Sequence, residues 1–107
     1  MTTQRVDSDV HEANGFCSAL DIEIFRAYKK VLHHIWTRAE VSSRRGLYLF
    51  DESNTRHPFC LHFSSSICGH VGDGPRAAAT ILHEAGFGSF EYLKDEVFNH
   101  EYAQFTK

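Results

Sequence analysis

The sequence predicts an α+β domain, in which a three-stranded antiparallel sheet is covered on one face by helices, in the order α-β-β-β-α-α. Three observations support it: helical spacing of apolar residues over 20–40, apolar and polar alternation from residue 59, and a glycine-proline start to an alanine-rich helix. A chain of 107 residues, 42% of them hydrophobic and 23% charged, suits a single folded domain. We expect residues 1–19 to form a polar N-terminal arm and residues 20–107 to form the domain.

The first twenty residues are polar and carry Asp7, Asp9 and Glu12, whereas a secretory signal needs a cationic start and an apolar run. No apolar run approaches the roughly 18 residues of a membrane span. The three cysteines are an odd number, which favours reduced thiols over a disulfide framework. We therefore expect a cytoplasmic protein without a membrane partner.

The longest predicted helix spans residues 20–40. Its apolar residues recur at helical spacing: Ile24, Phe25, Tyr28, Val31, Leu32, Ile35, Trp36 and Ala39. Asp21 near its start and Arg38 near its end suit the helix dipole. The segment from Ser42 to Gly46 is expected to end the helix.

Three strands are predicted next. Residues 47–50 form the first, a polar loop covers residues 51–58, and residues 59–63 and 67–71 form a hairpin around three serines. This pairing would place Cys60 opposite His70 and His62 opposite Cys68, with the apolar residues on the other face.

Two further helices complete the chain. Gly74 is expected to cap the first of them and Pro75 to occupy its first turn, and Gly86 suits its left-handed end. Ser89 is expected to cap a last helix over residues 90–99. We assign no element to the tail, residues 101–107.

The hairpin carries the first candidate site. Zinc binds thiolate sulfur and imidazole nitrogen, so the pairs Cys60/His62 and Cys68/His70 have the composition of a zinc site. However, neighbours on a flat sheet converge poorly on one ion, and buried cysteines are common in cores, so packing is the favoured interpretation. No catalytic residue is assigned, because no pair here specifies a nucleophile with an oriented base.

The turn before the alanine-rich helix carries the second candidate site. Gly72 and Gly74 would leave backbone N–H groups free at a helix N-terminus, and Arg76 adds a cation, which together suit a phosphate or carboxylate. Neither a P-loop nor a dinucleotide fingerprint is present, and Asp73 would repel an anion. A turn that only starts the helix is the commoner role of such a sequence.

Charge is distributed unevenly. Residues 24–50 contain six basic residues against the single acid Glu40, in a chain of net charge −3. We expect a basic partner-binding face made of Arg26, Lys29, Lys30, His33, Arg44 and Arg45. Such a face can meet nucleic acid, an acidic protein or the acidic last helix of another copy, which would give a homo-oligomer, although a solvated face is commoner.

The element order and the run from Gly72 to Ala79 resemble a double-stranded-RNA-binding domain over about residues 20–85. The resemblance implies RNA contacts from the first helix, from the loop after the first strand and from the start of the last helix of the unit. Arg56 and His57 lie in the predicted loop. The family's lysine cluster is matched only by Arg76.

We therefore expect a non-enzymatic binding protein, regulatory or inhibitor-like, that holds an acidic or phosphate-bearing partner. Its alternatives are a zinc protein built on the Cys/His hairpin and a nucleic-acid-binding module.

Overall fold

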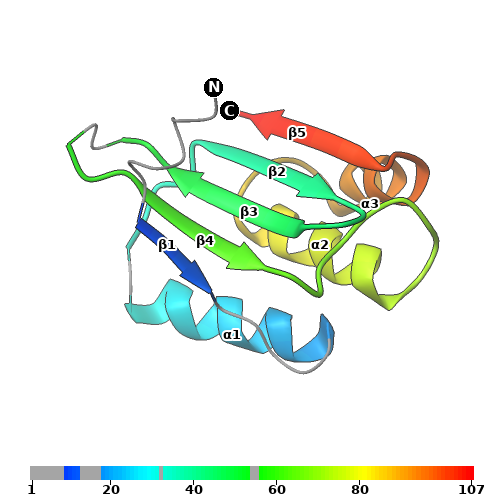
Figure 1. Cartoon of the computed structure of the whole chain (residues 1–107), viewed down its shortest axis with the longest axis horizontal. Coiled ribbons are helices and arrows are strands. Elements are labelled where there is room, and N and C mark those ends of the chain that lie inside the picture. Colours follow the sequence, from blue (N-terminus) through cyan, green and yellow to red (C-terminus); the bar gives the residue numbers. More distant parts are fainter. Residues whose placement is uncertain (1–8, 13–17, 32, 54–55) are drawn as a thin grey trace.

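The computed structural model describes residues 9–12, 18–31, 33–53 and 56–107 and has an α+β fold (Figure 1). Its elements are β1 (Asp9–Glu12), α1 (Ser18–Val31), β2 (Arg38–Ser42), β3 (Gly46–Asp51), β4 (Phe59–Phe63), α2 (Asp73–Glu84), α3 (Phe90–Asn99) and β5 (Tyr102–Thr106). No described helix is both long and apolar enough to span a bilayer.

The strands form one sheet in the order β1-β4-β3-β2-β5. Four strands are mutually antiparallel neighbours, and β1 lies parallel to β4 at one edge. Ala39, Leu49 and Leu61 are in register across the centre of the sheet. The antiparallel α+β class is thus confirmed, but the predicted number of strands, three, is too small. The predicted order α-β-β-β-α-α is also wrong, because β1 precedes α1 and β5 follows α3.

All three described helices cover one face of the sheet (Figure 1), and the core lies between the two layers. Phe25 of α1 meets Phe63 of β4 edge to face, with ring centroids 6.3 Å apart. Helices α1 and α2 run in the same direction, since Ser18 lies beside Asp73 at their starts and Arg26 reaches Glu84 at the end of α2.

The predicted helix over residues 20–40 is wrong from residue 33 onward. The following segment is extended because its backbone bonds to β3: Ile35 N donates to Asp51 Oδ2 at 3.2 Å and Thr37 N donates to Phe50 O at 2.8 Å. Ile35 is 64% exposed, although the helical pattern would bury it. Residues 38–42 alternate polar and apolar side chains, as a strand with one buried face requires.

The predicted strand over residues 67–71 is also wrong. Gly69 has a φ of +102° and donates its N–H to Val97 O at 2.7 Å, so this loop bonds to the end of α3. The strands beside β4 are β1 and β3 instead. Alternation in this segment does not indicate a strand, because Gly69 interrupts it with a positive φ.

The two chain ends also differ from expectation. Residues 9–12 of the predicted arm form β1 and residues 18–19 begin α1, while residues 1–8 and 13–17 lie outside the described residues. The C-terminal tail, to which no element was assigned, forms β5.

The two later helices are confirmed. Helix α2 begins at Asp73 with Gly72 as its N-cap, so the predicted cap at Gly74 lies two residues too late. Gly86 has the expected left-handed φ of +93°. The Ser89 hydroxyl accepts a bond from Tyr92 N at the start of α3.

Candidate functional site

One end of the molecule gathers several of the predicted binding residues. The β2–β3 hairpin, loop 64–72 and the start of α2 all lie at this end (Figure 1). Loop 64–72 links the other two, because a Cβ added to Gly69 would lie 3.3 Å from Ser43 Cβ and one added to Gly74 would lie 2.9 Å from Ile67 Cγ1. We call this region, with Arg44, Arg45 and Arg76, the hairpin end.

Arg44 and Arg45 are exposed in the tight turn between β2 and β3. The turn is fixed from both sides. Arg45 N donates to Ser42 Oγ at 2.9 Å, and His62 Nε2 donates to Arg45 O at 2.5 Å. Neither arginine forms an ion pair with another described residue, so both guanidinium groups remain available to a ligand.

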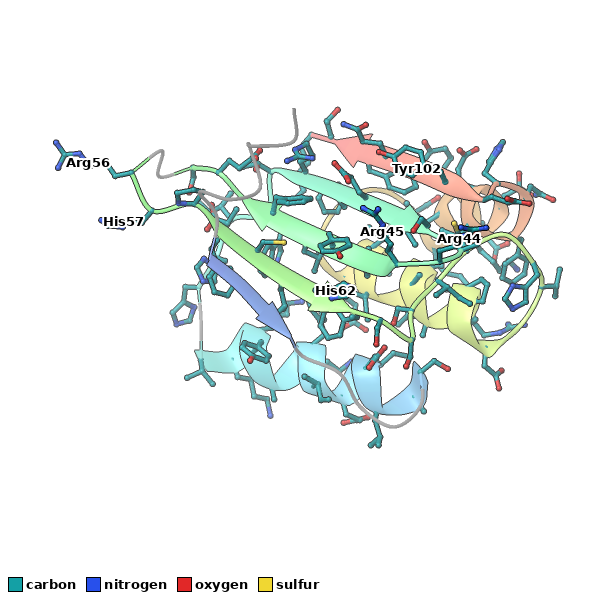
Figure 2. All side chains as sticks on the ribbon, viewed as in Figure 1. Arg44, Arg45, Arg56, His57, His62 and Tyr102 are labelled. Atoms are coloured by element: carbon teal, nitrogen blue, oxygen red, sulfur yellow. The ribbon has the colours of Figure 1, made fainter. Side chains whose placement is uncertain are left out.

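A hollow of about 390 Å³ lies beside these arginines. Tyr48 and Tyr102 contribute to its lining, and Tyr102 is 54% exposed. The Tyr48 ring stacks on His62 with centroids 4.1 Å apart. Figure 2 shows Arg44, Arg45, His62 and Tyr102 at this end, whereas Arg56 and His57 project from the opposite end.

The start of α2 contributes the third cation of the hairpin end. Gly72 provides no side-chain cap, and Arg76 N donates to Gly72 O at 3.1 Å. Arg76 lines a second hollow of about 350 Å³ together with Asp73 and with Ser18 of α1. The Arg76 guanidinium lies 5.9 Å from the centre of the Phe98 ring. This cation–π contact places the Arg76 side chain beside α3.

The hairpin end is not purely basic. Asp73 in the first turn of α2 and Glu101 before β5 are both exposed there. Glu40 also lines the larger hollow, but its carboxylate binds Arg38. The arrangement can therefore attract an anion at the arginines while Asp73 and Glu101 weaken that attraction.

The basic residues of α1 do not join the hairpin end. Arg26 binds Glu84 with Nη2 2.5 Å from Oε2, and Lys29 Nζ donates to Glu84 O at 3.3 Å. The hydrogen bonds and charge of Arg26 lower the pKa of Glu84 against the opposing effect of burial. These two residues fasten α1 to α2, and Lys30 and His33 lie near the far end of α1. The predicted basic face is thus divided.

The four Cys/His residues do not converge. Cys60 and His62 share the face of β4 that points away from the helices, but their neighbours on β3 are Phe50 and Tyr48. Cys68 is buried in the core, where burial and the charge of Glu101 raise its pKa to about 11. His70 is exposed. Within the described residues, no three His, Cys, Asp or Glu side chains could hold a metal ion.

Sequence reasoning missed a buried carboxylate at the opposite end. Asp51 is only 8% exposed and accepts bonds from His34 Nδ1 at 2.7 Å, from Ile35 N at 3.2 Å and from Ser53 N at 3.0 Å. Burial alone would raise its pKa, but the bonds from Ser53, His34 and Ile35 prevail and lower it. The Asp-x-Ser spacing was the available signal.

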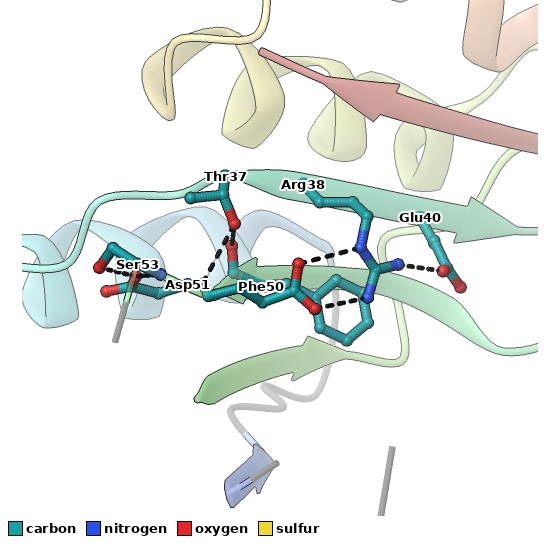
Figure 3. Close-up of polar contacts among 7 residues, drawn as sticks. Thr37, Arg38, Glu40, Phe50, Asp51 and Ser53 are labelled. Carbon is teal, nitrogen blue, oxygen red and sulfur yellow. Dashed lines mark hydrogen bonds and ion pairs between the residues drawn. The ribbon is translucent and has the colours of Figure 1, made fainter. Parts of the chain in front are cut away.

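Arg38 lies close to this network (Figure 3). Its guanidinium stands 3.9 Å from the centre of the Phe50 ring and binds Glu52 Oε2 at 2.9 Å and the carboxylate of Glu40. Glu52 N donates to Thr37 Oγ1 at 3.1 Å. These contacts satisfy Arg38 internally, so the network supports the fold at this end rather than offering a cation to a ligand.

Comparison with known protein families, characterised proteins and solved structures finds no match to this chain.

Proposed function

We propose that this protein is a non-catalytic binding protein that holds a phosphate-bearing partner at the hairpin end. One observation carries the proposal: Arg44 and Arg45, which form no ion pair among the described residues, lie at the same end of the fold as Arg76 and the start of α2. By contrast, Arg26 forms an ion pair with Glu84, and Arg38 forms one with Glu52.

The chemistry of these groups suits phosphate. Arginine presents a planar fork of donors that matches phosphate oxygens, and a helix N-terminus adds backbone N–H groups and a positive dipole end. The start of α1, at Ser18, borders the same hollow as Arg76, so two helix N-termini face one region. A partner with regularly spaced phosphates could engage several of these groups together.

Double-stranded RNA is the partner class that we favour. Elements α1, β2, β3, β4 and α2 follow the order helix, three antiparallel strands, helix, which is the order of the RNA-binding family that the sequence resembles. With β2 as the first strand of that unit, the loop after it is the Arg44–Arg45 turn rather than residues 51–57. This assignment brings two more cations to a position where the resemblance implies RNA contacts.

Fluorescence anisotropy with a labelled RNA duplex tests the proposal. Arg45→Glu should weaken binding by about tenfold or more, because it removes a phosphate contact and adds repulsion. Lys30→Glu makes the same change in charge at the far end of α1 and should have a much smaller effect. Affinity should also fall steeply as salt rises.

Equal losses from both variants would indicate a non-specific charge effect and would overturn the assignment of the site. No binding by the wild-type chain at low salt would overturn RNA as the partner. Circular dichroism of each variant, unchanged from wild type, is needed to exclude unfolding as the cause.

A further inference from the structure

The outer edge of β5 is the second surface with a definable partner. Among the described residues, β5 pairs only with β2, so it forms one margin of the sheet (Figure 1). Sheet margins are usually protected by charges, prolines or bulges, because exposed backbone groups pair with other strands. The opposite margin, β1, has the sequence DVHE, with two acids in four residues, whereas β5 reads YAQFT and contains neither charge nor proline.

The register shows which backbone groups of β5 point outward. At one end of the β2–β5 ladder Ser43 N donates to Glu101 O at 3.0 Å, and at the other Lys107 N donates to Thr37 O at 3.4 Å. Because bonding alternates along an antiparallel pair, residues 101, 103, 105 and 107 bond to β2. Gln104 at the centre of β5 and Thr106 after it therefore direct their N–H and C=O groups away from β2.

We propose that the β5 edge pairs with β5 of a second copy of this chain, antiparallel and about a two-fold axis at Gln104. This would join the two sheets into one. The geometry is self-complementary, because Gln104 is the middle residue of β5 and would face itself, while Tyr102 would face Thr106 of the second copy.

The charges at the two ends of the edge support this register over a slipped one. With Gln104 opposite itself, Glu101 lies opposite Lys107 of the second copy, and the two-fold axis repeats this acid-base match at the other end. Within one chain the Lys107 ammonium donates to Ala85 O at 2.7 Å, so it must leave that carbonyl to meet the acid. A shift by two residues would remove both matches. Two exposed aromatic side chains border the edge, Tyr102 at 54% and Tyr92 at 50%, and Tyr92 packs edge to face against Phe105 of β5.

Complementary variants at residue 104 test the register. Gln104→Lys and Gln104→Glu each place like charges face to face, so each alone should weaken self-association by about fivefold. An equimolar mixture should restore it, because lysine would then face glutamate. Sedimentation velocity of the full chain and of the mixture measures these states, with circular dichroism as the control for folding.

A cysteine pair gives an independent test in a Cys17→Ser background. Gln104→Cys should form an intermolecular disulfide under oxidation, since facing residues lie about 5.5 Å apart between Cα atoms, within disulfide range. Thr106→Cys is the matched control, because two copies of residue 106 would lie about 14 Å apart.

A wild-type chain that sediments as a monomer at all concentrations would overturn the proposal. So would a dimer that the residue 104 variants leave unchanged, or equal disulfide yields from Gln104→Cys and Thr106→Cys. Restored association in the mixture together with selective crosslinking at residue 104 would establish it.

Discussion

Asp51 determines how the chain passes from α1 into β2. Its carboxylate holds His34 through Nδ1 and Ile35 through the backbone N–H, and the His34 ring stacks on Phe59 with centroids 3.9 Å apart. Residues that sequence periodicity would place on a helix are thereby kept extended. A buried side-chain acceptor far along the chain can override a local helical pattern, and local spacing alone does not reveal it.

Asp51→Asn tests this role. The variant keeps the shape but weakens the bond to His34. An amide nitrogen in place of Oδ1 would also oppose the bonds that Ser53 N and Ser53 Oγ donate to Oδ1, at 3.0 and 2.5 Å. The free energy of unfolding should therefore fall by about 1–3 kcal/mol. Chemical denaturation measures it. Asp95→Asn, on the exposed face of α3, is the matched control and should change stability by less than about 0.5 kcal/mol.

The pH dependence of the same variant gives a second readout. Because the folded pKa of Asp51 lies below its unfolded value, its contribution to stability is present above the unfolded pKa of about 3.9 and is lost as pH falls through the folded pKa. Denaturation between pH 5 and pH 2, as an approximate range, should therefore show a shallower loss for Asp51→Asn than for wild type. Parallel curves would contradict the assigned role.

At the scale of single elements, the glycines at the start of α2 can serve close packing or ligand binding. A Cβ on Gly74 would lie 2.9 Å from Ile67 Cγ1 and 3.1 Å from Ser65 O, whereas one on Gly72 would meet only the ring of His70, at 3.1 Å. His70 is exposed and can move. Gly74 is thus explained by close packing against loop 64–72, without any ligand.

Alanine at each glycine separates these cases. Gly74→Ala should lower the free energy of unfolding by about 1–2 kcal/mol, because the Ser65 carbonyl and the partly buried side chain of Ile67 must shift. Gly72→Ala should change it little, since its φ of 175° is extended backbone that any residue adopts. Thermal denaturation compares the two variants, and similar melting temperatures would contradict the packing explanation.

Asp73 in the same turn has opposite effects on helix stability and on phosphate binding. A carboxylate in the first turn of a helix stabilises it through the dipole, by about 0.3–1 kcal/mol, but it also repels phosphate. Asp73→Asn should therefore melt slightly earlier and bind an RNA duplex a few-fold more tightly, as measured by anisotropy. Glu91→Gln, in the first turn of α3, should give a similar stability loss with no gain in affinity.

At the scale of the whole molecule, the sequence predicts the layered α+β arrangement better than it predicts the order of the strands. The inward faces of β4 and of α2 follow their apolar spacing, so Phe63 and Ile81 are buried as expected. Strands β2 and β5 were missed although both alternate. Ala39 also fits a helical stripe, and only two residues, Ala103 and Phe105, mark the buried face of β5. The hairpin end could not be foreseen, since it depends on a loop that packs Gly69 against Ser43.

The arrangement of the strands in sequence has a consequence for how the chain folds. The middle strands of the sheet, β4-β3-β2, come from one continuous stretch of the chain. The two margins are β1 and β5, the first and last described strands in the sequence. Contacts that are close in sequence close small loops and form early, whereas the margins require large loops to close. Amide hydrogen exchange should consequently be slowest at Leu49 in β3 and fastest in β1, so that the sheet opens from its margins toward its centre.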